Sequence, residues 1–143
     1  MPNRREFDHM VNHNFKVEIE GVTVASFMEV SGLESVTEVV ETSDGDDLLV
    51  RKRPGRTGYS NIVMQRGFTA SDELWKWHKA VTDGRVERKS GSIILCDDTG
   101  SEIMRYNFFE GWPCRWKISE LSARDRGTLV EEIEIVVEKI ERA

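Results

Sequence analysis

The chain has 143 residues, which is the size of one ordinary domain, and 38% of them are hydrophobic. Its 20 Lys and Arg residues and 26 Asp and Glu residues give a formal net charge of −6, which argues against general attraction to nucleic acid or to an anionic membrane. No apolar run approaches the roughly 20 residues of a membrane span, and the N-terminal residues lack the apolar segment of a secretory signal. We therefore expect a single domain over residues 1–143 that is made in the cytoplasm without a signal peptide and that, as an isolated subunit, does not bind membranes.

The N-terminal part of the chain predicts short strands. Phe15–Ile19 alternates apolar and polar residues, and a tight turn leads into a second strand over Val22–Met28. Val36–Val40 is rich in β-branched residues, which favour strands.

A long excursion follows over Glu41–Ser60, where the hydrophobic pattern lapses. It contains turn signals in Ser43–Asp47 and at Pro54-Gly55, and excursions of this length in a compact domain are usually functional. Its charged residues form an acidic limb and then a basic limb: Glu41, Asp44, Asp46 and Asp47, followed by Arg51, Lys52, Arg53 and Arg56. The acidic limb lacks the glycine and the bidentate glutamate of a calcium loop. Two interpretations remain: a solvated loop, or a projecting hairpin that docks on neighbouring copies, where opposite charges set the orientation.

One helix is predicted over Asp72–Thr82. The segment Thr69–Asp72 resembles a capping box, and an Asp-Gly pair ends the helix. Leu74, Trp77 and Val81 share one face, so we expect the helix to pack its apolar stripe on a sheet and to flank the body.

The remaining segments predict strands. Periodicity and turn signals place them over Asn61–Phe68, Ser92–Cys96, Glu102–Phe109 and Trp112–Ile118, with a hairpin turn at Asp97–Gly100. On the first of them, Ile62, Met64 and Phe68 lie on one side. Leu129–Ile140 fits one face of a helix or of a strand, and its density of β-branched residues favours the strand.

The histidines and cysteines do not form a recognisable chemical site. His9 and His13 are four residues apart but lack the further ligands that a zinc site needs. His78 is interpreted as a packing or surface residue, and Cys96 and Cys114 as two buried thiols without a disulfide. We therefore expect no catalytic residues, no metal, no cofactor and no enzyme activity.

Several sequence blocks together resemble a known family. They are His13–Gly21, Ala25–Leu33, Arg53–Gly67, Leu74–His78, Gly111–Trp116, Leu121 and Glu131–Ile135 with Glu138. In this order, and over nearly the whole chain, they are similar to the tail-tube proteins of contractile phages and phage-like contractile injection systems. Cys114 departs from the aliphatic residue common in that family, and as a small buried hydrophobe it would play the same role.

The resemblance implies a mainly β (α+β) fold. Two packed antiparallel sheets would form a barrel-like body, with one flanking α-helix and a long projecting hairpin. Copies would assemble into hexameric rings that stack into a conduit for DNA or protein cargo, with the inner sheets joined into one β-barrel around the channel. Alternatives with the same fold are a baseplate tube-initiator or adaptor protein and a ring protein of type VI secretion.

The resemblance also implies binding partners and a location in an assembled particle. The chain would contact other copies of itself, a sheath protein around the tube, baseplate or tube-initiator proteins, terminator proteins and the cargo in the lumen. Within the assembled particle, inter-ring and inter-subunit contacts are expected from the charged residues of the excursion and from Tyr59 at its end.

The last predicted strand suggests which residues face the channel. Its core set would be Leu129, Ile133, Ile135 and Val137, which turns Glu132, Glu134 and Glu138 to the other face. Glutamates there would give a polar, predominantly acidic channel wall that repels nucleic acid and keeps acidic cargo from sticking. Alternatively, these glutamates lie on the outer surface beneath the sheath.

Overall fold

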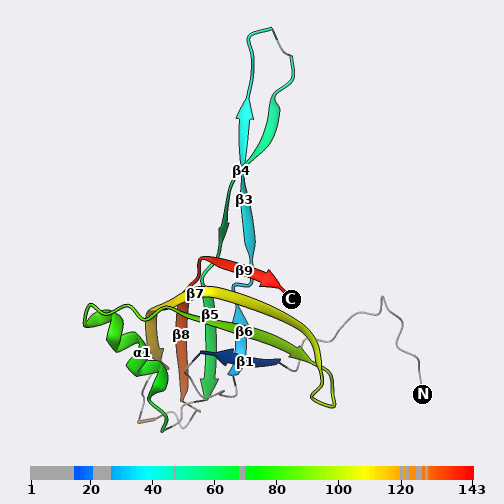
Figure 1. The fold of residues 1–143 in the computed structure, drawn as a ribbon. Coiled ribbons are helices and arrows are strands. Elements are labelled where there is room, and N and C mark those ends of the chain that lie inside the picture. Colours follow the sequence, from blue (N-terminus) through cyan, green and yellow to red (C-terminus); the bar gives the residue numbers. More distant parts are fainter. Residues whose placement is uncertain are drawn as a thin grey trace, which may run out of the picture.

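The computed structural model describes residues 15–20, 27–46, 48–67, 70–119, 121, 123–124, 127 and 129–143. Most of them lie in strands, as expected for a mainly β fold (Figure 1). In chain order the elements are β1 (Phe15–Ile19), β2 (Phe27–Ser31), β3 (Ser35–Thr42), β4 (Arg51–Tyr59), β5 (Ile62–Gly67), α1 (Glu73–Thr82), β6 (Lys89–Cys96), β7 (Glu102–Ile118), β8 (Val130–Val136) and β9 (Lys139–Arg142). The expected strand over Val22–Met28 falls mostly outside the described residues, which begin again with β2.

Seven strands form an antiparallel sheet in the order β1-β6-β7-β8-β5-β2, with β9 also paired to β7. The 17-residue strand β7 belongs to both halves of this sheet. Residues 102–111 pair with β6, while residues 112–118 pair with β8. We call the half made of β1, β6, β9 and residues 102–111 sheet A, and the half made of β2, β5, β8 and residues 112–118 sheet B.

The chain changes sheets within β7, where two separate strands were expected. Glu110 has a positive φ of 55°, a conformation that is uncommon for a residue with a side chain. Phe108 is buried before this point, and Gly111 and Pro113 are buried after it. The residues that face inward therefore change from even-numbered to odd-numbered positions here. The turn at Glu110 therefore lets one strand bury side chains in both sheets.

The C-terminal segment also differs from the expected single strand. It is a strand and not a helix, but it is divided into β8 and β9, which lie end to end along β7. The break lies at Val137 and Glu138, beside the turn of β7, and the backbone N–H of Glu138 donates to the carbonyl oxygen of Phe109 (3.1 Å). Both paired strands thus change direction together where the chain passes from one sheet to the other.

The core lies between the two sheets, which confirms the two packed antiparallel sheets. Buried side chains come from β1, β6 and β7 on one side and from β5 and β8 on the other: Val17, Ile19, Ile93 and Phe108, and Ile62, Met64, Ile133 and Ile135. Ile133, Ile135 and Val137 are buried as predicted, whereas Leu129 is only half-buried. Among the described residues β1 and β2 do not pair, so the barrel-like body is an open sandwich, without a closed barrel.

Helix α1 packs its apolar face on this core. Leu74 and Trp77 are buried as predicted, but Ala80 is the third buried residue and Val81 is half-exposed. The Trp77 indole N–H donates to the carbonyl oxygen of Glu87 (2.7 Å), which ties the helix to the segment before β6. The buried residues of the helix are three positions apart, whereas the predicted stripe ended at Val81. The buried face is therefore rotated slightly from the predicted face.

The helix begins and ends near the expected residues. Asp72 is the N-cap, but its side chain makes no capping hydrogen bond and instead pairs with Lys76 (3.4 Å). Thr69, the other half of the predicted capping box, lies outside the described residues. Asp83 is the C-cap, and Gly84 follows with a φ of 84°, a left-handed conformation that glycine adopts without strain.

Strands β3 and β4 form a separate two-stranded sheet that projects from the body (Figure 1). Pairing runs from Ser35 opposite Tyr59 to Thr42 opposite Arg51, so this hairpin begins before the predicted excursion. Pro54-Gly55 lies inside β4 at an irregularity in the pairing, where a turn was expected. Proline is tolerated there because a two-stranded sheet has only edge strands, and its missing N–H need not join a ladder.

Candidate assembly surfaces

The hairpin brings its acidic and basic limbs together. Glu41 on β3 lies directly opposite Lys52 on β4, and Arg51 and Arg53 occupy the neighbouring positions of β4. All of these side chains are exposed. Cross-strand pairs of opposite charge support a strand pairing by a few tenths of a kcal/mol to about 1 kcal/mol.

The other predicted contact residues lie in the turn, along β4 and at the base of the hairpin. Asp44 and Asp46 are exposed in the turn, and Arg56 is exposed on β4, while Asp47 lies outside the described residues. Tyr59 is different, because it is half-buried and packs against the core at the base. We conclude that Tyr59 anchors the hairpin on its own subunit.

An exposed apolar tip was missed by the sequence analysis. Leu48, Leu49 and Val50 follow the turn, and Leu48 is fully exposed at 101%. Val36 and Val39 on β3 are also more than half exposed. The signal was present in the sequence as three successive apolar residues, but it stood within a charged segment. Exposed apolar clusters of this kind mark interaction surfaces.

The outer face of sheet B carries Glu132 and Glu134. Both are half-buried, and they alternate with the buried Ile133 and Ile135, so they point away from the core as expected. The Gln65 side-chain amide donates to Glu132 Oε1 (2.8 Å), and the Asn61 side-chain amide donates to Glu134 Oε2 (2.9 Å). The bond from Asn61 is the main reason that the pKa of Glu134 is lowered.

Glu138 does not share this strand. It lies beyond the end of β8, at the bend before β9, and it is exposed. Arg88 Nη1 donates to its Oε1 (3.2 Å), which links the bend to the segment after α1. The alternation of inward and outward side chains ends with β8, so Glu138 does not continue the outward-facing set of Glu132 and Glu134.

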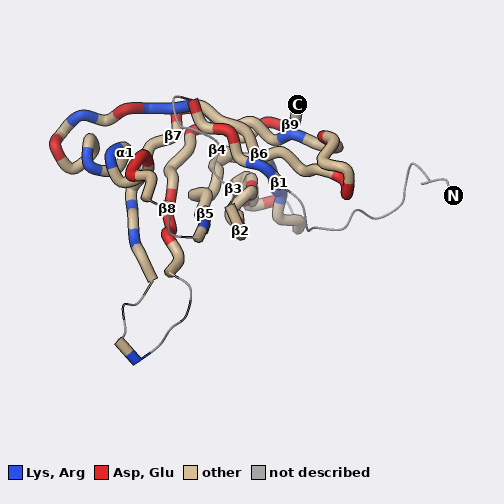
Figure 2. Tube along the Cα trace, turned by 90° about the horizontal axis from the view of Figure 1, so that it is seen from below, with Lys and Arg blue, Asp and Glu red and all other residues tan. Residues whose placement is uncertain are grey.

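Basic residues share the outer face of sheet B with these carboxylates. Arg115 lies opposite Glu134, and Lys117 lies opposite Glu132. Acidic residues recur along β8 when the molecule is viewed from below (Figure 2). With Glu29 on β2, the face holds three carboxylates and two cations, so it is polar and mixed, where a predominantly acidic face was expected.

Cys114 is exposed, contrary to the expected buried thiol, whereas Cys96 is buried. A register shift between Pro113 and Arg115 places Cys114 at a bulge of β7, which removes it from the strand's normal alternation. Its thiol donates to Glu134 Oε2 (3.4 Å). Partial desolvation of the sulfur, and then the bond to Glu134, raise the pKa of this thiol.

A buried ion pair at one end of sheet B was also missed. Arg66 Nε donates to Glu131 Oε1 at 2.7 Å, and both side chains are only 3% exposed. The Trp116 indole N–H donates to the other carboxylate oxygen of Glu131 (2.8 Å), and the Arg66 guanidinium lies 5.8 Å from the centre of the Phe27 ring. These contacts join β2, β5, β8 and β7 across the core side of sheet B.

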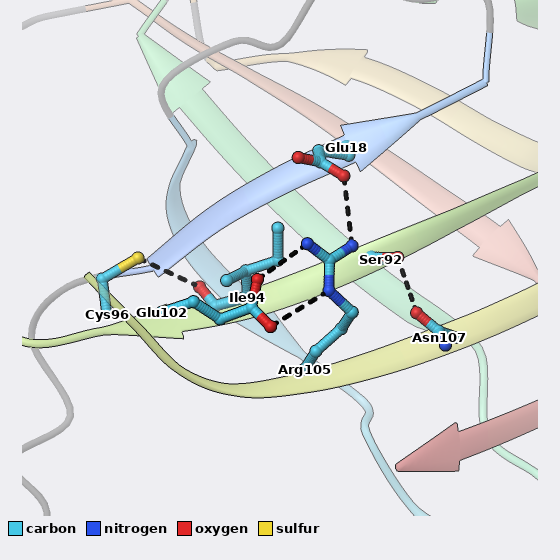
Figure 3. Close-up of polar contacts among 7 residues, drawn as sticks. All are labelled: Glu18, Ser92, Ile94, Cys96, Glu102, Arg105 and Asn107. Atoms are coloured by element: carbon cyan, nitrogen blue, oxygen red, sulfur yellow. Dashed lines mark hydrogen bonds and ion pairs between the residues drawn. The ribbon is translucent and has the colours of Figure 1, made fainter. Parts of the chain in front are cut away.

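The outer face of sheet A is covered by a second polar network (Figure 3). Arg105 lies over the buried Ile94 and binds Glu102 (2.7 Å) and Glu18 (3.2 Å). The bond from Arg105 lowers the pKa of Glu102, and the bonds to Glu102 and then Glu18 raise the pKa of Arg105. Beside it, the hydroxyl of Ser92 donates to Asn107 Oδ1 (2.7 Å).

The described residues show a groove but no metal centre. A groove of about 550 Å³ opens at the base of the hairpin, between β2 and sheet A, lined by Met28, Leu33, Tyr59 and Tyr106 among others. Within the described ranges, no group of three or more His, Cys, Asp or Glu side chains is placed to hold a metal ion, and no helix is long and apolar enough to cross a membrane. His78 is half-buried on α1, while His9 and His13 lie outside the described residues.

Comparison with known proteins gives one family and a consistent set of structures. The family model described as T4-like virus tail tube protein gp19 matches residues 11–141. A chain of the PVC sheath–tube complex, an extracellular contractile injection system in its extended state, is 26% identical with a TM-score of 0.85, covering 96% of this chain and 93% of that one. No curated protein sequence matches the chain.

Two further structures extend the comparison. A chain of the PVC sheath/tube terminator is also 26% identical, with a TM-score of 0.84 and coverage of 96% of this chain and 98% of that one. Hcp1 from Flavobacterium johnsoniae is 21% identical with a TM-score of 0.61, covering 90% of this chain and 94% of that one, which is a likeness of fold alone.

Proposed function

Because the chain belongs to the T4-like virus tail tube protein family and is a structural subunit of such a tube, we propose that its copies join through sheet B into hexameric rings. The rings stack into the conduit of a contractile tail or injection system, through which DNA or protein cargo passes. The role is structural, without catalysis, metal or cofactor.

The two unpaired edges of sheet B carry this proposal. Among the residues that the structure describes, strand β2 pairs only with β5, and residues 112–118 of β7 pair only with β8. With four antiparallel strands, the two edge strands run in opposite directions. Joining β2 of one copy to β7 of the next therefore continues the antiparallel pattern around a ring. Closing the ring removes every exposed edge of sheet B, which would otherwise be an aggregation hazard.

We place the outer face of sheet B on the channel. The opposite face of sheet B is buried in the subunit, so Glu132 and Glu134 would line the lumen if sheet B forms the wall. Glu138, beyond the end of β8, would lie near the rim of the same wall. Sheet A, with its Arg105 network, would then face outward, toward a sheath protein.

The hairpin supplies contacts between stacked rings. It projects from the body, all but two residues of its strands are exposed, and it combines paired charges with an apolar tip. Docking on copies in the next ring would bury the tip. The PVC relatives, which belong to a sheath–tube complex and a sheath/tube terminator, support a sheath and a terminator as further partners.

Negative-stain electron microscopy of the purified protein tests the proposal. Rings or stacked tubes are the expected result, and a map of the tube would locate Glu132 and Glu134 relative to the channel. A protein that stays monomeric at high concentration, even with a preformed baseplate as a template, would contradict it.

A further inference from the structure

The two edges of sheet B carry opposite charges on the same outer face. Glu29 on β2 lies opposite Gln65, which lies opposite Glu132, which in turn lies opposite Lys117 on β7. This row across the sheet therefore begins with a carboxylate at one edge and ends with an ammonium at the other. Arg115 adds a second cation to the β7 edge.

The end members of the row have no ion-pair partner among the described residues. Arg66, Arg88 and Arg105, by contrast, all bind carboxylates of their own subunit. Glu29 and Lys117 are exposed and lie about as far apart as the four strands allow. Their charges are thus available to groups outside the subunit.

We propose that these charges make the seam between two copies directional. The inference rests on the proposed function, in which β2 of one copy pairs with β7 of the next. Across that seam Glu29 meets the cations Arg115 and Lys117 of the neighbouring copy, and opposite charges on adjacent strands stabilise the pairing.

The same charges oppose the competing ways of joining two edges. Pairing β2 with β2 would bring two Glu29 side chains together, and pairing β7 with β7 would bring four cations together. Either arrangement is an isologous contact that joins two like edges and cannot by itself close a ring, whereas the head-to-tail seam can. Like charges on adjacent strands are destabilising, so the edge charges select the ring over the dimer.

Charge reversal with complementation tests this seam. Glu29→Lys makes the β2 edge basic, and Arg115→Glu with Lys117→Glu makes the β7 edge acidic. Each variant alone should need about tenfold more protein than the natural chain to form rings. An equimolar mixture should restore ring formation, because alternating copies present opposite charges at every seam. The chain with all three substitutions should also form rings.

Controls separate the seam from folding and from the proposed function. Lys16→Glu, a reversal on the outer face of sheet A, should leave ring formation unchanged, and Lys117→Glu alone provides a milder variant if the double reversal folds poorly. Reversals that leave ring formation unchanged, or a loss that neither the mixture nor the combined variant restores, would overturn the inference. A natural chain that forms no rings would instead contradict the proposed function.

Discussion

The hairpin and the body of this protein are stabilised in opposite ways. The body holds side chains that are completely buried, including Ile62, Met64 and Ile133. The hairpin buries almost nothing, and only Val40 and Tyr59 of its two strands are even half-buried. An isolated two-stranded hairpin is marginal in water. The comparison shows that the body is stabilised by a core within the subunit, whereas the hairpin would gain buried surface only from the contacts between copies that are proposed above.

Removing a core side chain should affect folding most. Trp77 is 3% exposed, so Trp77→Ala should lower the free energy of unfolding by about 3–5 kcal/mol. Thermal or urea unfolding of the isolated subunit measures this. Trp75→Ala is the matched control, because Trp75 is 42% exposed and its T-shaped contact with Trp116 contributes only about 0.5–1.5 kcal/mol, so the loss of stability should be smaller. An unchanged unfolding midpoint for Trp77→Ala would place this stripe outside the core.

Changing the hairpin tip should affect assembly and not folding. Burial of a leucine contributes about 1.5–3 kcal/mol, so Leu48→Asp with Leu49→Asp should strongly shorten tubes or leave single rings. The unfolding midpoint of the subunit should stay the same. Val86→Asp, at an exposed valine outside the hairpin, controls for added negative charge. Tubes of normal length from the double variant would show that the tip is not buried between rings.

Reversing the basic limb should also affect assembly, but in a way that depends on salt. Changing Arg51, Lys52 and Arg53 to Glu should block stacking at low ionic strength while leaving a folded, soluble subunit. Because exposed ion pairs contribute up to about 1 kcal/mol each and are screened by salt, added salt should reduce the difference from the natural chain. Tube lengths measured across a salt series test this, and normal stacking at low salt would refute the docking role of these charges.

The smallest predicted effect concerns the outer face of sheet B. Partial desolvation, and then the bond to Glu134, raise the pKa of the Cys114 thiol, so Glu134→Gln should lower that pKa and speed alkylation of Cys114 near neutral pH by a few-fold. Mass spectrometry follows the reaction, with the buried Cys96 as an internal reference. If sheet B lines the channel, a small maleimide should still label Cys114 in tubes, whereas a bulky polymer maleimide should label only free subunits. Equal labelling of tubes by both reagents would place this face outside the channel.

Periodicity predicted the strands that bury one face. The alternation in Phe15–Ile19 and Ile133–Ile135 reports burial directly, because each apolar residue meets the core and each polar residue leaves it. Periodicity could not predict the points within β7 at which the inward-facing side of the strand changes. At Glu110 and at Cys114 the backbone switches parity, through a positive φ in one case and a bulge in the other, and neither leaves a local hydrophobic signal.

The candidate surfaces were predicted unevenly for a similar reason. The charged limbs of the hairpin were visible as runs along the chain, and so was the outward direction of Glu132. Arg66 and Glu131 are polar residues at core positions of β5 and β8, and only the pairing of those strands brings them together. The unpaired edges of sheet B likewise follow from the order of strands, which a sequence does not state.

The long strand β7 has a mechanical consequence. Its backbone runs without interruption from sheet A into sheet B, so the two sheets are connected by peptide bonds as well as by packed side chains. If sheet B forms the channel wall and sheet A the outer surface, as proposed, a push on the outer surface of a tube would reach the wall along this backbone, and the ladders with β6, β8 and β9 would share the load. The two sheets should therefore move together when the tube is pushed, without sliding past each other at the hydrophobic core.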